Sequence, residues 1–179
     1  MLKVENTALA LIDVQGKLAG LMHEKDALFR NLEILIRGAQ ALELPIFWLE
    51  QYPKGLGPTV PEIAQLLGDR KPIEKTCFSA FGSDQFRAQL RDSNRRQLLV
   101  AGIETHICVY QTVRHLLDEG FQVEVVGDAA SSRTEQSKAL GLDKMMRAGA
   151  EVTSVEMALF ELLEEAGTPQ FKTIAGLVK

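Results

Sequence analysis

The stretch Gln97-Leu98-Leu99-Val100-Ala101-Gly102 carries the clearest fold signal, and the polar turn Ile103-Glu104-Thr105-His106-Ile107-Cys108 follows it directly. A short, continuous apolar run is typical of a strand buried on both faces of a parallel sheet. Residues 108–119 have a helical pattern, and Gly120 is a natural stop for that helix. A buried strand, a turn and a helix in this order predict one unit of an α/β fold.

Similar apolar runs predict the other strands, and helical spacing separates most of them. Expected strands cover residues 8–12, 45–49, 71–75, 121–126 and 151–154, and expected helices cover 26–42, 83–92, 134–148 and 155–164. Ser83 is the expected N-cap of the second of these helices. The Gly- and Pro-rich segment from Gln51 to Pro61 reads as a loop of the kind that often forms a lid. This alternation predicts a three-layer α/β/α sandwich with a mainly parallel, Rossmann-like sheet of about six strands.

Composition limits the class of protein. The chain has 179 residues, 46% of them apolar, which suits a single domain over residues 1–179. The net charge of −4 and the absence of a basic run give no reason to expect a nucleic-acid partner. The apolar run at 8–12 is too short for a signal core or a membrane span, and two cysteines make no disulfide framework. We therefore expect a cytoplasmic protein without a membrane partner.

Polar residues stand where the predicted strands end. Asp13 follows the first strand, Lys75 ends the third extended segment, Cys108 follows the turn at 103–107, and Asp128 follows the strand at 121–126. In open parallel sheets, ligands bind beyond the carboxyl ends of the strands. These residues are therefore candidates to share one pocket, although they are far apart in the sequence.

The three candidate catalytic residues each have a plainer interpretation. Cys108 at a helix N-terminus would have amide donors and a partial positive charge that favour the thiolate, but a free cysteine is often only a buried small hydrophobe. Asp13 could take and return a proton, or could simply cap the local turn. Lys75 could hold the carboxylate and thiolate together, or could be a solvated surface lysine.

Other kinds of site are poorly supported. Cys77 is expected to be a packed side chain beside the site. The histidines His23, His106 and His115 have no metal-ligand spacing, so we expect no metal. No Gly-x-Ser-x-Gly, Gly-x-Gly-x-x-Gly or Walker A pattern occurs, so neither a serine hydrolase nor a dinucleotide or ATP cofactor is indicated.

Four segments together resemble the isochorismatase-like hydrolases. They are the first strand through Asp13-Val14-Gln15, the lysine segment Lys75–Phe81, the nucleophile turn Val100–Val109, and Asp128–Arg133, in order over about residues 8–156. The resemblance implies an α/β/α sandwich with an Asp13-Lys75-Cys108 triad. It also implies a non-proline cis peptide at Ile103-Glu104, which would turn the Glu104 amide to join the Cys108 amide in an oxyanion hole. Members are usually dimers, tetramers or larger homo-oligomers.

Two sequence differences from other members of this superfamily limit the reactions that we expect. The nicotinamidases of this superfamily carry an Asp-x-His-type metal motif after the second strand, whereas residues 50–57 here contain no histidine. True isochorismatases, which cleave a vinyl ether, generally lack the nucleophilic cysteine. A retained Cys108 points to acyl chemistry, and Gln51–Gly57 resembles uncharacterised isochorismatase-domain-containing proteins.

The leading interpretation is a metal-free cysteine hydrolase of a small amide or related C–N substrate, with no cofactor. Vinyl-ether hydrolysis and nicotinamidase-like activity are the alternative reactions. A catalytically silent scaffold and a redox protein that uses Cys77 with Cys108 are alternatives from other classes. The expected pocket wall, in which each side chain could equally be core packing, comprises Gln15, Tyr52, Phe78, Phe81 and His106.

Overall fold

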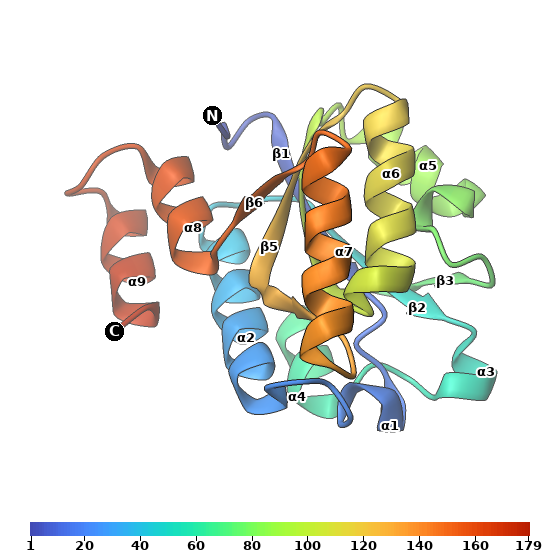
Figure 1. Cartoon of the computed structure of the whole chain (residues 1–179). Coiled ribbons are helices and arrows are strands. Elements are labelled where there is room, and N and C mark those ends of the chain that lie inside the picture. The colour runs from blue at the N-terminus through green and yellow to red at the C-terminus, as the bar shows by residue number, and fades with distance from the viewer.

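One six-stranded parallel sheet forms the centre of the protein. The computed structural model describes all 179 residues, and its strands lie in the order β3-β2-β1-β4-β5-β6 (Figure 1). The strands are β1 (Thr7–Ile12), β2 (Ile46–Gln51), β3 (Ile73–Lys75), β4 (Gln97–Ile103), β5 (Gln122–Ser131) and β6 (Glu151–Thr153). Every neighbouring pair is parallel. The predicted α/β sandwich is confirmed.

Helices cover both faces of the sheet. They are α1 (Gly16–Ala19), α2 (Lys25–Ala41), α3 (Pro53–Leu56), α4 (Pro61–Ala64), α5 (Asp84–Asp92), α6 (Tyr110–Asp118), α7 (Glu135–Arg147), α8 (Val155–Leu163) and α9 (Pro169–Leu177). Figure 1 shows α2 and α8 on one side of the sheet, and α5, α6 and α7 on the other. None of the helices combines the length and hydropathy that a bilayer crossing requires.

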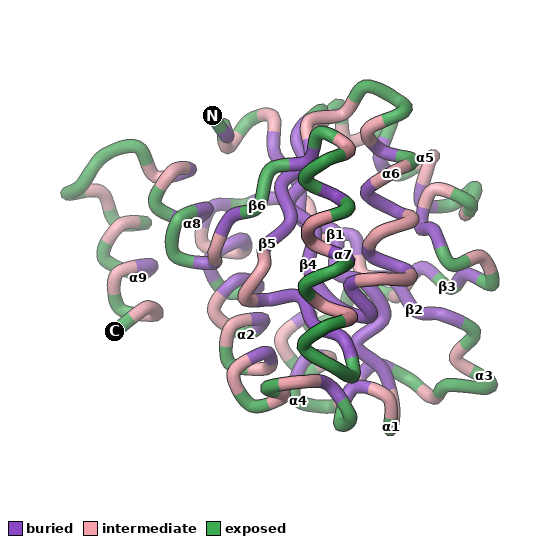
Figure 2. The backbone as a smooth tube through the Cα atoms, in the orientation of Figure 1, coloured by how far each residue is buried: buried purple, intermediate pink, exposed green.

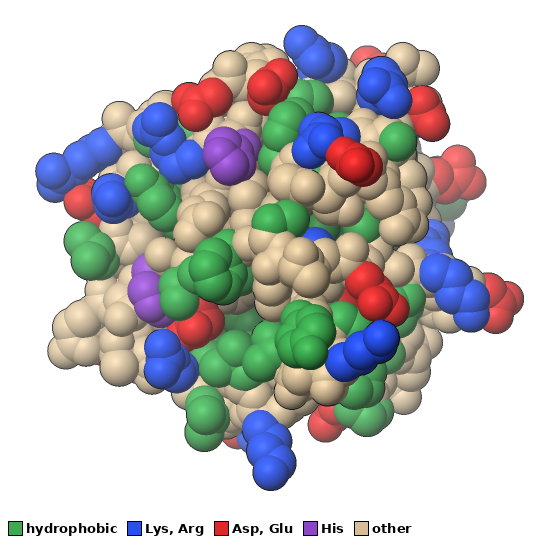
Figure 3. All heavy atoms as spheres, turned by 90° about the vertical axis from the view of Figure 1, so that its right-hand side faces the viewer, with side chains coloured by type: hydrophobic (Ala, Val, Ile, Leu, Met, Phe, Trp, Pro, Cys, Tyr) green, Lys and Arg blue, Asp and Glu red, His purple; other side chains and the backbone are tan.

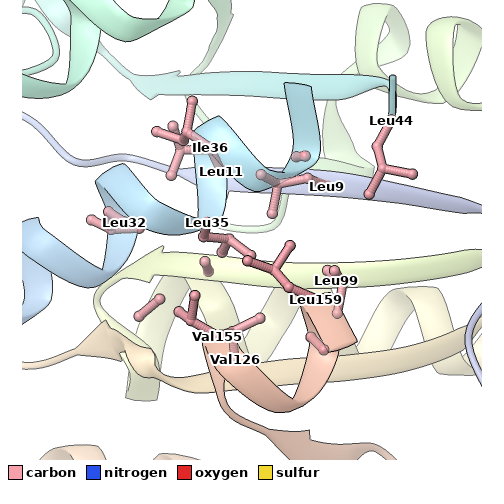
Figure 4. Close-up of a cluster of buried hydrophobic side chains, with 14 of the residues drawn as sticks. Leu9, Leu11, Leu32, Leu35, Ile36, Leu44, Leu99, Val126, Val155 and Leu159 are labelled. Carbon is pink, nitrogen blue, oxygen red and sulfur yellow. The ribbon is translucent and has the colours of Figure 1, made fainter. Parts of the chain in front are cut away.

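Successive side chains along each strand point to opposite faces of the sheet and therefore belong to two separate hydrophobic cores. In β1, Leu9 and Leu11 join the cluster under α2 and α8, whereas Ala8, Ala10 and Ile12 join the cluster under α5, α6 and α7. Figure 4 shows the first cluster, in which Leu159 of α8 lies against the α2 side chains. Figure 2 shows the strands as the most continuously buried part of the chain. Burial on both faces explains why the strands are apolar throughout.

The strand order reverses direction between β1 and β4. After β1 the chain adds β2 and β3 on one side, then returns to build β4 on the other side. The connections therefore leave β1 and β4 in opposite directions, and the carboxyl ends of such a strand pair are where open α/β sheets usually bind ligands. Gly102, with φ of 115°, allows a close approach here, because a Cβ would lie 2.1 Å from the carbonyl oxygen of Ile12.

Four local predictions are wrong or incomplete. The helix expected to open at Cys108 is preceded by a π-helical turn, η3 (Thr105–Val109), so Cys108 lies inside that turn. Strand β5 continues through Gly127 and Asp128 to Ser131, because its last residues pair with the end of β4. The expected loop at 51–61 contains the short helix α3, and α9 lies beyond the last predicted element.

Candidate active site

Lys75 lies at the centre of a buried polar group at the carboxyl edge of the sheet. Its side chain has no exposed surface, and its Nζ donates to Asp13 Oδ2 at 2.6 Å. The same Nζ donates to Gln51 Oε1 at 2.8 Å and to the Phe78 carbonyl oxygen at 3.0 Å. An ammonium group this deeply buried needs such partners, because losing water without replacement bonds is costly. The interpretation of Lys75 as a solvated surface residue is therefore wrong.

Asp13 presents one carboxylate oxygen to Lys75 and keeps the other free. The residue is 4% exposed and has a left-handed backbone, with φ of 51°, which turns the chain away from β1. Its Oδ1 is buried and has no hydrogen-bond partner. Burial raises the pKa of this carboxyl, and the Lys75 charge and hydrogen bond oppose that rise. A buried carboxylate oxygen without a partner is poised to accept a proton.

Cys108 lies beside this carboxylate, and its thiol is mainly protonated. The residue is 8% exposed. Burial, followed by the negative charge of Asp13, raises the pKa of the thiol to about 12, and the Lys75 charge only partly offsets the rise. Burial and the Asp13 charge therefore act against the thiolate that the helix N-terminus was expected to favour. A neutral thiol next to a proton acceptor suits deprotonation during attack.

The backbone before Cys108 offers a hydrogen-bond donor. The Ile103-Glu104 peptide is cis, as the family resemblance implies. The Glu104 amide makes no hydrogen bond within the chain, whereas its carbonyl oxygen accepts from the amides of Ile107 and Val109. The Glu104 side chain is held away by Arg133, whose Nε donates to Oε1 at 2.9 Å. The oxyanion hole formed by the Glu104 and Cys108 amides stays a prediction.

A cleft of about 390 Å³ lies at the β3 edge next to Lys75. Its lining includes Tyr52 and Lys54 from the segment after β2, and Cys77 and Ser83 from the segment after β3. The role of Tyr52 and Phe78 in a substrate pocket stays a prediction. Tyr52 lines this cleft, and the side chain of Phe78 is 53% exposed. Figure 3 shows hydrophobic side chains gathered over the middle and lower part of the face that carries β3 and α3.

Two predicted pocket residues have other roles. Gln15 is fully buried, and its side chain bonds the backbone of Gln51 and the Gly57 carbonyl oxygen. It therefore fastens the 52–60 segment to the sheet and has no group left for a substrate. Phe81 lines a different groove, where the guanidinium of Arg87 lies 6.0 Å from its ring centre. His106 is half-buried, with Nδ1 2.9 Å from Ser132 Oγ.

Gln51 is a site residue that the sequence analysis did not single out. Its Oε1 accepts from Lys75, and its Nε2 donates to the Thr76 carbonyl oxygen at 2.8 Å. It therefore fixes the ammonium group that faces Asp13. Its position at the end of β2, between the ends of β1 and β3, was the available signal.

Asp128 and His115 form their hydrogen bonds outside this group. The Asp128 carboxylate accepts from the Val155 amide at 2.9 Å at the start of α8, so the expectation that Asp128 shares the pocket is wrong. His115 Nδ1 lies 2.8 Å from Ser79 Oγ. No three His, Cys, Asp or Glu side chains are grouped as metal ligands.

Comparison with known proteins identifies the family. The isochorismatase domain model matches residues 7–157. The chain is similar to the secreted isochorismatase effector Isc1 of Phytophthora sojae, with 36% identity over 97% of this chain and 85% of that protein. It is also similar to isochorismatase domain-containing protein 2 of Bos taurus, with 38% identity over 97% of this chain and 83% of that protein.

Solved structures agree with this assignment. The MAR1 ribonuclease of Caenorhabditis elegans has a TM-score of 0.92 and 34% identity, covering 99% of this chain and 91% of that one. The YcaC gene product of Escherichia coli, described as an octameric hydrolase of unknown specificity, also has a TM-score of 0.92, with 26% identity over 98% and 89% of the two chains. The fold, the site geometry and these matches lead to one conclusion: the chain belongs to the isochorismatase family of hydrolases.

Proposed function

We propose that the protein is a metal-free cysteine hydrolase that cleaves a small amide or a related C–N bond through a covalent acyl-enzyme. The observation that carries the proposal is the buried ion pair between Lys75 and Asp13. Oδ1 of Asp13 has no hydrogen-bond partner, and the charge of this carboxylate raises the pKa of the Cys108 thiol. A nucleophile, a base and an orienting cation in contact are the components of covalent hydrolysis.

The proposed reaction begins with proton transfer, because the thiol is neutral at the start. Asp13 takes the Cys108 proton as Sγ attacks the substrate carbonyl, and the Glu104 and Cys108 amides hold the oxyanion. Asp13 then gives this proton to the leaving nitrogen as the C–N bond breaks. Asp13 next deprotonates a water molecule, which attacks the thioester. Release of the acid returns the proton to Cys108.

Lys75 has a positioning and electrostatic role in this reaction. Its charge opposes the increases in the pKa of Asp13 and of Cys108. It therefore lowers the cost of the thiolate that forms during attack. Gln51 and the Phe78 carbonyl oxygen hold its ammonium group in place.

The burial of the nucleophile favours a small substrate. Cys108 is 8% exposed, and the cleft next to Lys75, of about 390 Å³, lies within the usual range of roughly 300–1,000 Å³ for small-ligand pockets. Tyr52, Phe78 and His106 are the remaining proposed wall residues. The C. elegans relative is named a ribonuclease, whereas the 8% exposure of Cys108 favours a substrate smaller than an RNA backbone.

A substrate screen tests the proposal. We expect the wild type to hydrolyse members of a panel of small amides and ureides, and Cys108→Ala to lose at least about 10³-fold in kcat/KM while remaining folded. Cys77→Ala is the matched control and should retain activity. Mass spectrometry during turnover should find the acyl group on Cys108.

Each alternative has its own result in this screen. Activity on vinyl ethers that survives in Cys108→Ala would favour isochorismatase-type chemistry, and preference for nicotinamide would favour the nicotinamidase alternative. No turnover of any compound, together with a thiol that titrates near its free value of about 8.5, would favour the scaffold. A Cys77–Cys108 disulfide after mild oxidation would favour the redox alternative.

Assembly and location remain expectations. We propose a homo-oligomer, supported by the octameric description of the E. coli relative and by the exposed side chains of Leu21, Tyr52 and Phe78. The P. sojae relative is named as secreted, so the cytoplasmic location of this chain stays a prediction.

A further inference from the structure

A groove rich in arginine lies away from the candidate active site. It has a volume of about 440 Å³ and lies between the end of α5 and the loops that precede β4 and β5. Its basic side chains are those of Arg87, Arg91, Arg95 and Arg96. Residues 94–96 and Phe121 lie at the amino ends of β4 and β5, whereas Asp13 and Cys108 follow the carboxyl ends of β1 and β4. The groove is therefore a separate site.

The charges in this groove are poorly balanced within the chain. Glu119 is the only acidic side chain that lines it, although the protein as a whole has a net charge of −4. Arg91 and Arg96 are exposed, and their guanidinium groups make no ion pair or hydrogen bond. Arg87 and Arg91, four residues apart on α5, repel each other. A bound anion would relieve this repulsion.

Contacts with the chain orient three of the four guanidinium groups, those of Arg87, Arg95 and Arg96. Arg87 pairs with Asp84 and donates to the Phe81 carbonyl oxygen at 2.6 Å. Arg95 donates to the Val4 carbonyl oxygen at 2.8 Å. Arg96 lies over the Phe121 ring, 4.7 Å from its centre. Stacking and single hydrogen bonds restrict these side chains while leaving several of their donors free.

We propose that this groove binds a small molecule that carries a diphosphate or triphosphate group. Guanidinium forks match phosphate oxygens in pairs. Three arginines without an ion pair, beside Arg87 that pairs with Asp84, suit a compact multiple charge in a groove of this size. A carboxylate-rich peptide spreads its charges over a greater length. A long nucleic acid would also meet a protein whose net charge is negative.

Calorimetric titration with inorganic pyrophosphate, without added metal and at fixed salt, tests the proposal. The double variant Arg91→Gln/Arg96→Gln removes two exposed charges from the groove. The control Arg37→Gln/Arg147→Gln removes the same charge from α2 and α7, where each arginine pairs on its own helix. We expect the groove variant to weaken binding about tenfold or more, and the control to match the wild type.

Each other outcome overturns the proposal. It fails if the wild type does not bind millimolar pyrophosphate, or if both double variants weaken binding equally. Citrate that binds as tightly as pyrophosphate would indicate a general anion surface. A poly-glutamate peptide or a single-stranded oligonucleotide that binds more tightly, with the same dependence on Arg91 and Arg96, would indicate a macromolecular partner.

Discussion

At the scale of single residues, the chemistry depends on how one proton is shared between Asp13 and Cys108. Burial raises the pKa of both groups, and the negative charge of Asp13 raises that of the thiol further. The sequence placed both residues at strand ends, but it could not show the direction in which the fold shifts the pKa of the thiol. The pKa of a thiol depends on tertiary burial and on a charge 95 residues away in the sequence, and no local pattern contains that information.

Asp13→Asn separates thiol acidity from catalysis. Removing the carboxylate charge takes away a cause of the raised thiol pKa and leaves the Lys75 charge, so the pKa should fall. In a Cys77→Ser background we expect iodoacetamide to label Cys108 faster at pH 8 than in the parent, while turnover falls at least about 10²-fold for lack of the base. Asparagine suits the left-handed backbone at this position.

The parent carrying only Cys77→Ser is the control for labelling, and circular dichroism checks the fold of both proteins. Slower labelling in Asp13→Asn would show that Asp13 does not raise the pKa of the thiol. Unchanged turnover would show that another group acts as the base.

At the scale of elements, the strands were predictable because burial on both faces leaves an apolar run within the sequence itself. Strands 97–103 and 7–12 differ from their predictions by about one residue. The π-helical turn at 105–109 was not predictable, because its distinguishing feature is a hydrogen-bond pattern rather than a composition. The extension of β5 depends likewise on pairing with the end of β4, which lies on another segment.

The π-helical turn is also fixed by helix α7. A Cβ on Gly141 would lie 3.0 Å from backbone atoms of Thr105 and His106, so Gly141→Ala must displace α7 or the turn. We expect a loss of about 1–3 kcal/mol in the free energy of unfolding and a fall in kcat on the order of tenfold. Chemical denaturation and kinetics on a confirmed substrate measure the two effects.

Gly176→Ala in α9 is the matched control, because beyond its chain neighbours and its own helix backbone no atom lies within 4 Å of the added Cβ. Higher helix propensity should stabilise that variant by about 0.5–1 kcal/mol without changing kcat. Equal gains in stability from both substitutions would show that α7 does not constrain the nucleophile turn.

At the scale of the whole molecule, the parallel sheet buries charged side chains in two separate places, Lys75 at its carboxyl edge and Glu124 within β5. The carboxyl edge carries Lys75 in a group with ionic and hydrogen-bond partners, whereas Glu124 in β5 is buried without equivalent support. Glu124 is 2% exposed, and its Oε1 has no partner. Burial, followed by the charges of Glu161 and Glu151, raises its pKa to about 7.

The raised pKa of Glu124 makes global stability depend on pH. Between pH 4.5, its unperturbed value, and about 7, the folded protein keeps a proton that the unfolded chain releases. The unfolded state therefore binds fewer protons, and the contribution of Glu124 to the free energy of unfolding falls as pH rises through this window. Below it both states are protonated, and above it both are ionised.

Glu124→Gln removes this titration while keeping the shape of the side chain. We expect the free energy of unfolding of the variant, relative to wild type, to increase from pH 4.5 to pH 8, with most of the change before pH 7. Urea denaturation across this range measures it. Glu74→Gln, at an exposed position in β3, is the control and should track the wild type. Parallel curves for wild type and Glu124→Gln would mean that the Glu124 carboxylate is as easily ionised in the fold as in the unfolded chain.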